Sequence, residues 1–210
     1  MKLVCLALLS ALLAPLAGAA EVLKGDPEAG KAKSATCVAC HGQDGNSMVP
    51  SFPKLAGLGE KYLLQQMQYI RDGVRYVPQM VGQVDGKSDQ DLADIAAYYN
   101  VQERSRQRAS DKLLDLGEKV YRAGVAGRNV AACTACHSPR GVGNDPAGFP
   151  ALAGQHADYV AAQLKAYRTG YENPEEGRST DGESKIMRSN AFGLSDMEIE
   201  AVANYVSGLR

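Results

Sequence analysis

Cys37-Val38-Ala39-Cys40-His41 has the pattern C-x-x-C-H, and Cys133-Thr134-Ala135-Cys136-His137 repeats it later in the chain. Two cysteines three positions apart share one face of a helix, so their sulfurs can bond the two vinyl groups of one porphyrin. The histidine that follows is placed to offer an imidazole nitrogen to the iron. The motifs therefore predict two covalently attached haem c groups, with Cys37, Cys40, Cys133 and Cys136 as attachment points and His41 and His137 as iron ligands.

The sequence around the second motif repeats the sequence around the first. Phe52-Pro53-Lys54-Leu55-Ala56-Gly57 returns as Phe149-Pro150-Ala151-Leu152-Ala153-Gly154 at an offset of 97. The same offset pairs Tyr62 with Tyr159, Gln66 with Gln163, and Arg71 with Arg168. The offset then rises to 107, which pairs Ser88-Asp89 with Ser195-Asp196. The second copy therefore carries about ten extra residues between Gly170 and Met187, and its segment Tyr171–Gly177 is predicted to be a loop because it contains Pro, Gly and several charges.

Each copy contains three helical patterns and no alternating strand pattern, so the predicted fold is all-α, with two tandem domains and a short linker. The first helices are expected at Pro27–Ala39 and Leu113–Ala126, and the middle helices at residues 60–72 and 157–169. The last helices show apolar stripes with a period of i, i+3, i+4, i+7, namely Leu92, Ile95, Ala96 and Tyr99, and Ile199, Val202, Ala203 and Val206. Each of these two helices begins with a predicted capping box, Ser88 with Asp91 and Ser195 with Glu198. The predicted boundaries are residues 21–103 for domain 1 and its haem, 104–112 for the linker, and 113–210 for domain 2 and its haem.

Residues 1–20 have the features of a cleaved secretory signal peptide: Lys2, an apolar stretch from Leu3 to Leu16, and Ala17-Gly18-Ala19 before the cut. The apolar stretch is short for a membrane span, although a retained anchor helix is the alternative. Cleavage would remove Cys5 and leave four of the five cysteines, all of them in the two motifs. Two disulfides would use up all four and exclude haem attachment. A zinc site does not require a histidine directly after each cysteine pair, and the gap between the pairs is long for a zinc ribbon. We therefore expect a periplasmic haem protein with no membrane anchor after cleavage.

The ligand opposite each histidine decides whether the iron is closed for electron transfer or open for catalysis. Met80 and Met187 are the predicted ligands, because each follows a middle helix in chain expected to be irregular and because they are 107 positions apart, the offset of the helix that follows. Three other methionines are not expected to bind iron. Met67 is predicted to pack in the core of its helix, Met197 has Gln90 as its counterpart, and Met48 is too close to Cys40. His156 has Gly59 as its counterpart, so it is predicted to be a surface or interdomain histidine. The carbonyl groups of Pro53 and Pro150 are the predicted hydrogen-bond acceptors for His41 and His137.

Charge gives less information than the motifs. The chain has 23 Lys and Arg against 24 Asp and Glu, and no basic patch that suggests nucleic acid. The segment Asn100–Ser110 contains Arg104, Arg106 and Arg108, and it is interpreted as a solvated linker, with a docking patch for an acidic partner as the alternative. The extra segment of the second copy is acidic, with Glu172, Glu175, Glu176, Asp181 and Glu183. Because negative charge stabilises ferric iron, unequal potentials are predicted for the two haems, with a small effect if these carboxylates are exposed.

Each half resembles the class I c-type cytochromes: a first helix, C-x-x-C-H, the turn Pro53-Lys54-Leu55-Ala56-Gly57, a methionine loop, and a last helix with an aromatic residue. In that fold the first and last helices cross beside the haem, and the matching residues are Gly30 with Tyr98, and Gly117 and Tyr121 with Tyr205. The tandem is similar to the dihaem cytochrome c4 family, notably at Cys40–Ser47, Leu92–Tyr99 and Ala153–His156. This resemblance implies two His/Met-ligated haems, propionates near the domain interface, and a periplasmic carrier that takes electrons from a membrane-bound donor such as a bc1-type complex and delivers them to a terminal oxidase.

Two other functions remain open at the level of sequence. One is an enzyme, such as a dihaem peroxidase or a thiosulfate-oxidising cytochrome, which needs an open position on one iron; the paired methionines argue against it. The other is a tightly bound subunit of a larger oxidoreductase, because the chain is also similar, less closely, to the dihaem subunit of flavocytochrome c sulfide dehydrogenase. The prediction is therefore an electron carrier and not an enzyme.

Overall fold

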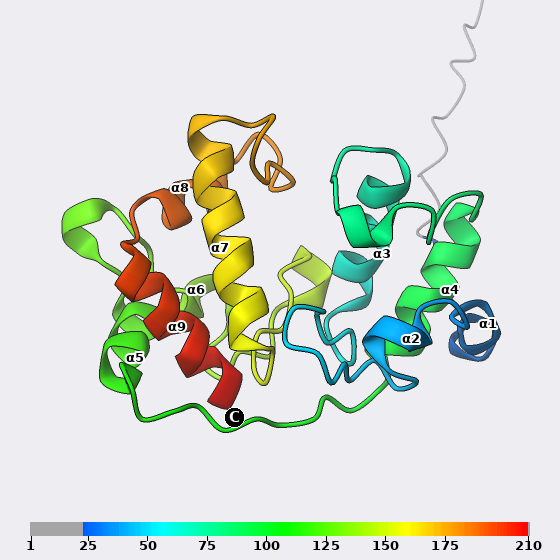
Figure 1. Cartoon of the computed structure of the whole chain (residues 1–210), viewed down its shortest axis with the longest axis horizontal. Coiled ribbons are helices and arrows are strands. Elements are labelled where there is room, and N and C mark those ends of the chain that lie inside the picture. The colour runs from blue at the N-terminus through cyan, green and yellow to red at the C-terminus, as the bar shows by residue number, and fades with distance from the viewer. Residues whose placement is uncertain (1–22, 210) are drawn as a thin grey trace, which may run out of the picture.

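The computed structural model describes residues 23–209 of the chain. The predicted signal peptide, residues 1–20, lies outside the described residues. The described part forms two helical lobes side by side, joined by an extended segment that runs along one edge (Figure 1). The first lobe, called the first half below, contains α1 (Pro27–Lys33), α2 (Val38–His41), α3 (Glu60–Arg71), the 3-10 turn η1 (Pro78–Met80) and α4 (Asp89–Asn100). The second half contains α5 (Leu114–Ala123), η2 (Ala126–Arg128), α6 (Thr134–His137), η3 (Asp145–Ala147), α7 (Ala157–Glu172), α8 (Ile186–Phe192) and α9 (Asp196–Gly208).

The all-α prediction is confirmed. Between residues 23 and 209 the only β pairing is two isolated bridges, Val125 with Val130 and Asn144 with Phe149. None of the helices in this part of the chain is long and apolar enough to cross a membrane.

The first and last helices of each half pack together at a glycine. A Cβ atom on Gly30 would overlap the carbonyl oxygen of Asp94 and lie 2.8 Å from the Cβ of Tyr98, so α1 approaches α4 closely only because Gly30 has no side chain. Gly117 on α5 meets α9 in the same way, with the Cβ of Tyr205 at 2.8 Å. The pairs Gly30–Tyr98 and Gly117–Tyr205 are therefore confirmed as contacts between the first and last helices.

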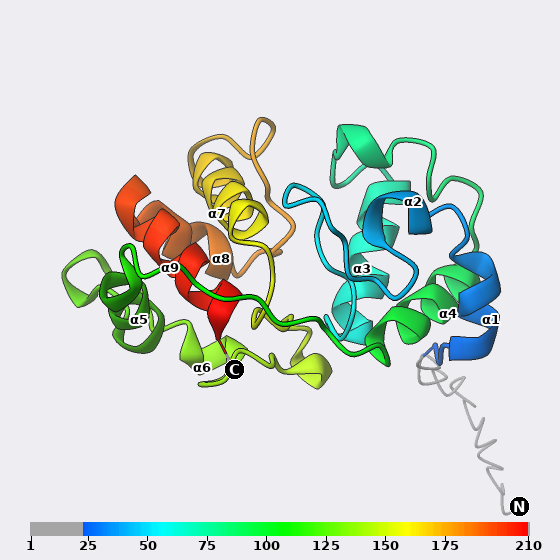
Figure 2. The same cartoon turned by 60° about the horizontal axis from the view of Figure 1, so that its bottom comes forward.

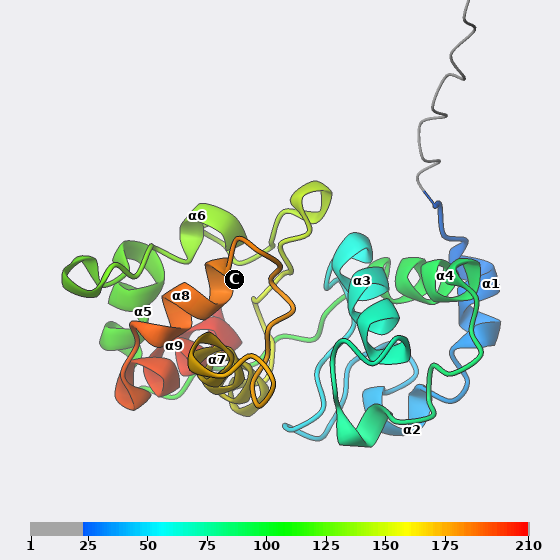
Figure 3. The ribbon, with the colours of Figure 1, turned by 90° about the horizontal axis from the view of Figure 1, so that it is seen from above.

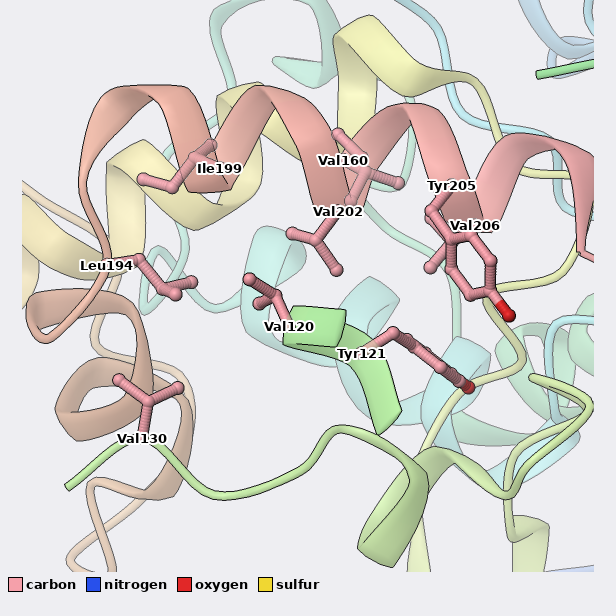
Figure 4. Close-up of a cluster of buried hydrophobic side chains, with 10 residues drawn as sticks. Val120, Tyr121, Val130, Val160, Leu194, Ile199, Val202, Tyr205 and Val206 are labelled. Carbon is pink, nitrogen blue, oxygen red and sulfur yellow. The ribbon is translucent and has the colours of Figure 1, made fainter. Parts of the chain in front are cut away.

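The last helices supply most of the core. The four apolar residues predicted for the stripe of α4 and the four predicted for α9 are all buried. Figure 4 shows the cluster of the second half, where Ile199, Val202 and Val206 of α9 face Val120 and Tyr121 of α5. Both predicted capping boxes are present, with Ser88 and Asp91 starting α4 and Ser195 and Glu198 starting α9.

Three predicted helix ends were wrong. The helix expected over Pro27–Ala39 ends at Lys33 and a new turn of helix starts at Val38, because Ser34 closes α1 by donating from Oγ to the carbonyl of Lys31. In the second half, α5 ends at Ala123 and not at Ala126, since Gly124 turns the chain with φ +66°. Conversely, α7 continues three residues past Thr169 to Glu172, so the segment predicted to be a loop from Tyr171 begins inside this helix.

The middle helices α3 and α7 lie on the inner sides of the two halves and face each other (Figures 1 and 3). The extended segment passes beside the C-terminal part of α9, as Figure 2 shows, where the amide of Asn204 donates to the carbonyl groups of Ser110 and Lys112 at 2.9 and 3.0 Å. The interface between the halves includes the surface between α3 and α7, and also the loops that bring Lys54 of the first half against Gln155 of the second.

Candidate functional site

The predicted site residues of the first half line one cavity of 840 Å³. Cys37, Cys40 and His41 reach it from the turn before α2 and from α2 itself, and Met80 reaches it from η1. The remaining wall is largely apolar and includes Leu55, Leu58, Leu63, Ile70 and Ile95. An apolar cavity of this size that gathers two thiols, an imidazole and a thioether matches the donor set and shape that a haem c requires.

His41 is buried and is fixed by one backbone carbonyl. Its Nδ1 lies 2.9 Å from the carbonyl oxygen of Pro53. A carbonyl only accepts, so Nδ1 carries the hydrogen and donates it, and Nε2 keeps its lone pair for an iron. Burial lowers the pKa of His41, with the bond to Pro53 acting in the opposite direction, and so favours the neutral imidazole that binds metals.

The second half repeats this arrangement at the histidine. Nδ1 of His137 donates to the carbonyl of Pro150 at 2.8 Å, and burial lowers the pKa of His137 as well. The prediction that the two proline carbonyls orient the two histidines is confirmed. Cys133 directly precedes α6 and Cys136 lies within it, as Cys37 precedes α2 and Cys40 lies within that helix. None of these four cysteines forms a disulfide in the described part of the chain.

The two predicted methionine ligands have different local structures. Met80 ends the 3-10 turn η1, whereas Met187 lies in the first turn of α8 and not in irregular chain as expected. This helix is held by a buried ion pair, because Asp181 accepts hydrogen bonds from the backbone N–H of Arg188 at 2.9 Å and from its Nε at 2.6 Å. Both methionines are half-buried.

The other sulfur and imidazole candidates lie where the sequence placed them. Met67 packs against the core of the first half, whereas Met48 and Met197 are 91% and 57% exposed. Of the two places predicted for His156, at the surface or between the domains, the structure shows the second, since its side chain is buried between the halves. Its Nε2 lies 2.9 Å from the Oγ of Ser47 in the first half, and its Nδ1 lies 2.7 Å from the side-chain amide of Gln107 in the linker.

Two arginines meet between α3 and α7. Arg75 donates to the Oε1 atoms of Gln66 and Gln163, both at 3.0 Å, and Arg178 donates to the same two atoms, both at 2.7 Å. Nη2 of Arg178 also donates to the hydroxyl of Tyr62 at 2.9 Å. Within the described part of the chain neither guanidinium is paired with a carboxylate, although Arg178 is only 7% exposed.

Buried cations normally have an anionic partner. Arg75 and Arg178 both line the 840 Å³ cavity, together with Tyr159 and Thr180 of the second half. The cavity of the first half therefore reaches the interface at a place that suits the carboxylates of an acidic cofactor. The propionates of a haem have that chemistry, so this end of the cavity fits haem as well as the end with the cysteines does.

The role of Arg178 was not predictable from the sequence. The pairs Tyr62 with Tyr159 and Gln66 with Gln163 serve in the sequence only as markers of the repeat, whereas the structure brings all four residues into one network with Arg75 and Arg178. Arg178 comes from the extra segment of the second half, which has no counterpart in the first. The one sequence feature that could have indicated this role is that Arg178 is the single arginine of an otherwise acidic segment.

The linker interpretation was wrong for one residue. Arg104 does not point into solvent but donates from Nε to the carbonyl of Ala56 at 2.7 Å and from Nη1 to those of Ala151 and Ala153 at 3.0 and 3.2 Å. Three carbonyls from both halves offset part of the loss of hydration of its guanidinium, whose Nη2 is buried without a hydrogen-bond partner. The prediction holds for Arg106 and Arg108, which are exposed.

The acidic segment is mostly screened. Glu172, Glu175, Glu176 and Glu183 are exposed, and Asp181 is neutralised by Arg188. The exposed carboxylates are the case for which a small effect on the haem potentials is predicted, although Glu175 and Glu176 also lie at the wall of the 840 Å³ cavity.

Comparisons with known proteins agree on one family. The profile of the family described as Cytochrome c matches residues 27–100 and 115–210. Cytochrome c4 of Pseudomonas aeruginosa is 52% identical over 185 residues, which cover 88% of this chain and 89% of that protein. The crystal structure of reduced recombinant cytochrome c4 from Pseudomonas stutzeri superposes with a TM-score of 0.84 at 50% identity, covering 89% of this chain and 100% of that one. A more distant relative, the thiosulfate dehydrogenase electron acceptor of Thiomonas intermedia, is 34% identical over 179 residues, covering 83% of this chain and 79% of that protein.

Proposed function

This chain belongs to the cytochrome c family and, within it, to the cytochromes c4, so it carries two haem c groups and transfers electrons. We propose that both irons have His/Met ligation and that the protein works in the periplasm. His41 and Met80 would hold the iron of the first half, and His137 and Met187 that of the second. Cys37, Cys40, Cys133 and Cys136 would form the thioether bonds. When bound, the haems supply one-electron chemistry as the iron cycles between ferric and ferrous states.

The observation that carries this proposal is the pair of buried histidines whose Nδ1–H groups are taken by proline carbonyls. Each histidine is held in one tautomer and one ring orientation, with Nε2 available. A ligand that is fixed in this way does not have to move when the iron changes charge. This rigidity suits an electron carrier, in which nothing must bind or leave at the iron.

Arg75 and Arg178 would hold propionates at the interface. Two guanidiniums that share the acceptors Gln66 and Gln163 keep a positive region between the halves. Carboxylates from either haem would neutralise it. The same contacts would keep the two cofactors close to the interface, where electrons can pass between them.

For partners, we propose a membrane-bound donor such as a bc1-type complex and a terminal oxidase as acceptor. A second candidate donor is a thiosulfate dehydrogenase, because the 34% identical relative of Thiomonas intermedia is named as the electron acceptor of that enzyme. In both cases the protein would be a carrier and not itself the enzyme. Two features support a location in the periplasm. Residues 1–20 resemble a signal peptide, and the C-x-x-C-H motifs attach haem covalently, which keeps it bound in that compartment.

A two-step experiment tests this function. A pyridine haemochrome measurement on the mature protein should give two haems c per chain. The ferric protein is then mixed with thiosulfate alone, with thiosulfate plus a thiosulfate dehydrogenase, or with membranes that contain a bc1-type complex. Reduction only by an added donor supports a carrier, whereas reduction by thiosulfate alone would show an enzyme and contradict the proposal.

A further inference from the structure

We infer that Gln155, a residue of the second half, sets the reduction potential of the haem in the first half. It does so through the peptide group that orients His41. This inference rests on the proposed ligation of that haem by His41. It makes Gln155 a positioning residue, since its side chain acts on the ligand through the Pro53–Lys54 peptide.

The Pro53–Lys54 peptide has hydrogen bonds at both of its ends. Its carbonyl oxygen, on Pro53, accepts from Nδ1 of His41 at 2.9 Å. Its N–H, on Lys54, donates to Oε1 of Gln155 at 2.9 Å. Nε2 of Gln155 donates in turn to the carbonyl of Lys54, also at 2.9 Å. A continuous chain of hydrogen bonds therefore runs from the histidine of one half to a side chain of the other.

This chain of bonds is shielded from water. Gln155 and Lys54 are each 2% exposed. The orientation of the Gln155 amide is fixed by its partners, because the N–H of Lys54 requires an acceptor and the carbonyl of Lys54 requires a donor. Oε1 also accepts from the backbone N–H of His156 at 3.0 Å, which holds the side chain in place. Bonds in a dry, fixed arrangement polarise one another most strongly.

Polarisation of the peptide has a predictable effect on the iron. When the N–H of Lys54 donates to Gln155, electron density at the carbonyl oxygen of Pro53 increases. The bond from Nδ1–H of His41 then becomes stronger, and the imidazole becomes a more electron-rich ligand. An electron-rich ligand stabilises ferric iron, so Gln155 lowers the potential of the first haem.

The second half has a corresponding chain of hydrogen bonds, called a relay here, which runs from His137 to an acceptor in the first half. His137 donates to the carbonyl of Pro150, and the N–H of that peptide, on Ala151, donates to the backbone carbonyl of Leu58 in the first half at 3.1 Å. Leu58 is the repeat counterpart of Gln155, at the offset of 97. Both relays therefore cross the interface. The relay of the first haem ends on a side chain, that of Gln155, whereas the relay of the second haem ends on a backbone carbonyl, that of Leu58. Substitution of Gln155 should consequently act on one haem alone.

The test compares Gln155→Leu, which removes the acceptor, with Gln155→Glu, which replaces it by a stronger one. Gln107→Leu is the matched control. It is the same substitution at a glutamine of the linker, whose side chain is hydrogen-bonded to the ring of His156 but not to the Pro53–Lys54 or the Pro150–Ala151 peptide. Two quantities are measured on the dihaem protein: the midpoint potential of each haem, resolved by following its own NMR signals during a redox titration, and the chemical shift of the Nδ1 proton of each proximal histidine.

Gln155→Leu should increase the equilibrium constant for reduction of the first haem about threefold, which raises its midpoint potential by about 28 mV for one electron. Gln155→Glu should lower it. The Nδ1 proton of His41 should shift in opposite directions in the two variants, while that of His137, and both haems of Gln107→Leu, should stay as in the unaltered protein.

The inference is overturned if the His41 proton and the first potential do not move, if both variants move them in the same direction, or if both haems shift together. Should Gln155→Leu not fold, Gln155→Glu decides alone, because it keeps an acceptor at the same place. Failure of the proposed function is distinguishable, since it would be visible in the unaltered protein as the absence of two low-spin haems.

Discussion

Arg178 of the second half donates a hydrogen bond from Nη2 to the hydroxyl of Tyr62 in the first half, over 2.9 Å. The same guanidinium lies over the ring of Tyr167, 4.4 Å from its centroid. Burial raises the pKa of Tyr62, but the neighbouring Arg178 and Arg75 outweigh burial, so this pKa lies below its usual value. One arginine from the extra segment thus ties two aromatic residues of different halves together beside the candidate haem cavity.

Replacing Arg178 by methionine should reduce the unfolding free energy of the dihaem protein by about 3–5 kcal/mol, because its hydrogen-bond partners and any propionate it holds would be left buried without a counterpart. Denaturant unfolding followed by haem absorbance measures this. Arg106→Met, which removes an exposed arginine of the linker, is the control and should change stability by less than about 0.5 kcal/mol. Equal effects of the two substitutions would contradict the role given to Arg178.

Arg104→Met should destabilise the protein by about 2–3 kcal/mol, because three carbonyl groups from both halves lose a charged donor. Burial lowers the pKa of Arg104 to about 10, yet the side chain stays charged at neutral pH. Arg108→Met, at an exposed position of the same segment, provides the comparison. If Arg104→Met changed the free energy of unfolding as little as Arg108→Met does, Arg104 would have no structural importance.

Gly30→Ala should lower the stability of the protein by about 1–3 kcal/mol, since the new methyl group would overlap the carbonyl oxygen of Asp94 and force α1 away from α4. Gly117→Ala should have the same effect on α5 and α9. Thermal unfolding of each variant measures the loss. Gly82→Ala is a control for steric overlap, because a Cβ there meets no atom within 4 Å, although its φ of +80° adds a strain cost of its own.

His156 should make the protein less stable as the pH falls below 6.5. Burial lowers its pKa in the folded state from 6.5, with Lys54 acting in the same direction and the carbonyl of Ser47 and Asp158 opposing it. Below pH 6.5 the unfolded chain therefore binds a proton at this residue more readily than the folded chain does. The stabilisation is complete above pH 6.5 and is lost as the pH falls towards the folded pKa, with a slope of at most about 1.4 kcal/mol per pH unit.

Unfolding measurements at several pH values between 5 and 8 test this for the unaltered protein and for His156→Gln. The variant should be less stable at pH 7.5, because the contacts with Ser47 and Gln107 change, but its stability should fall less steeply below pH 6.5. Parallel curves for the two proteins would show that His156 is not the group responsible.

Much of each half was predictable because it depends on local patterns. The stripe Leu92, Ile95, Ala96, Tyr99 needs only a helical period and one buried face, and all four residues are buried. The bond from His41 to the carbonyl of Pro53 spans 12 positions, within one loop of the repeat. Repetition added a second, independent indication at each of these positions.

Contacts between the halves were not predictable in this way. Gln155 and Lys54 are 101 positions apart, and Arg178 and Gln66 are 112 positions apart. No periodicity links such residues, since their meeting depends on how two finished domains dock. Arg104 shows the same difficulty, because a polar stretch rich in arginine has the composition of a solvated linker even where one side chain is anchored to buried carbonyls. The break of the first helix at Ser34 is a smaller case, in which a side chain competed with the helix for a carbonyl group.

The methionine-to-iron absorption band at the red edge of the ferric spectrum shows whether a histidine and a methionine close both irons. The unaltered protein should show this band with low-spin iron only. Met80→Ala and Met187→Ala should each remove about half of its intensity, one methionine serving each haem, and the double variant should remove all of it. High-spin iron in the unaltered resting protein, or a band that survives either substitution at full strength, would rule out His/Met ligation of both irons.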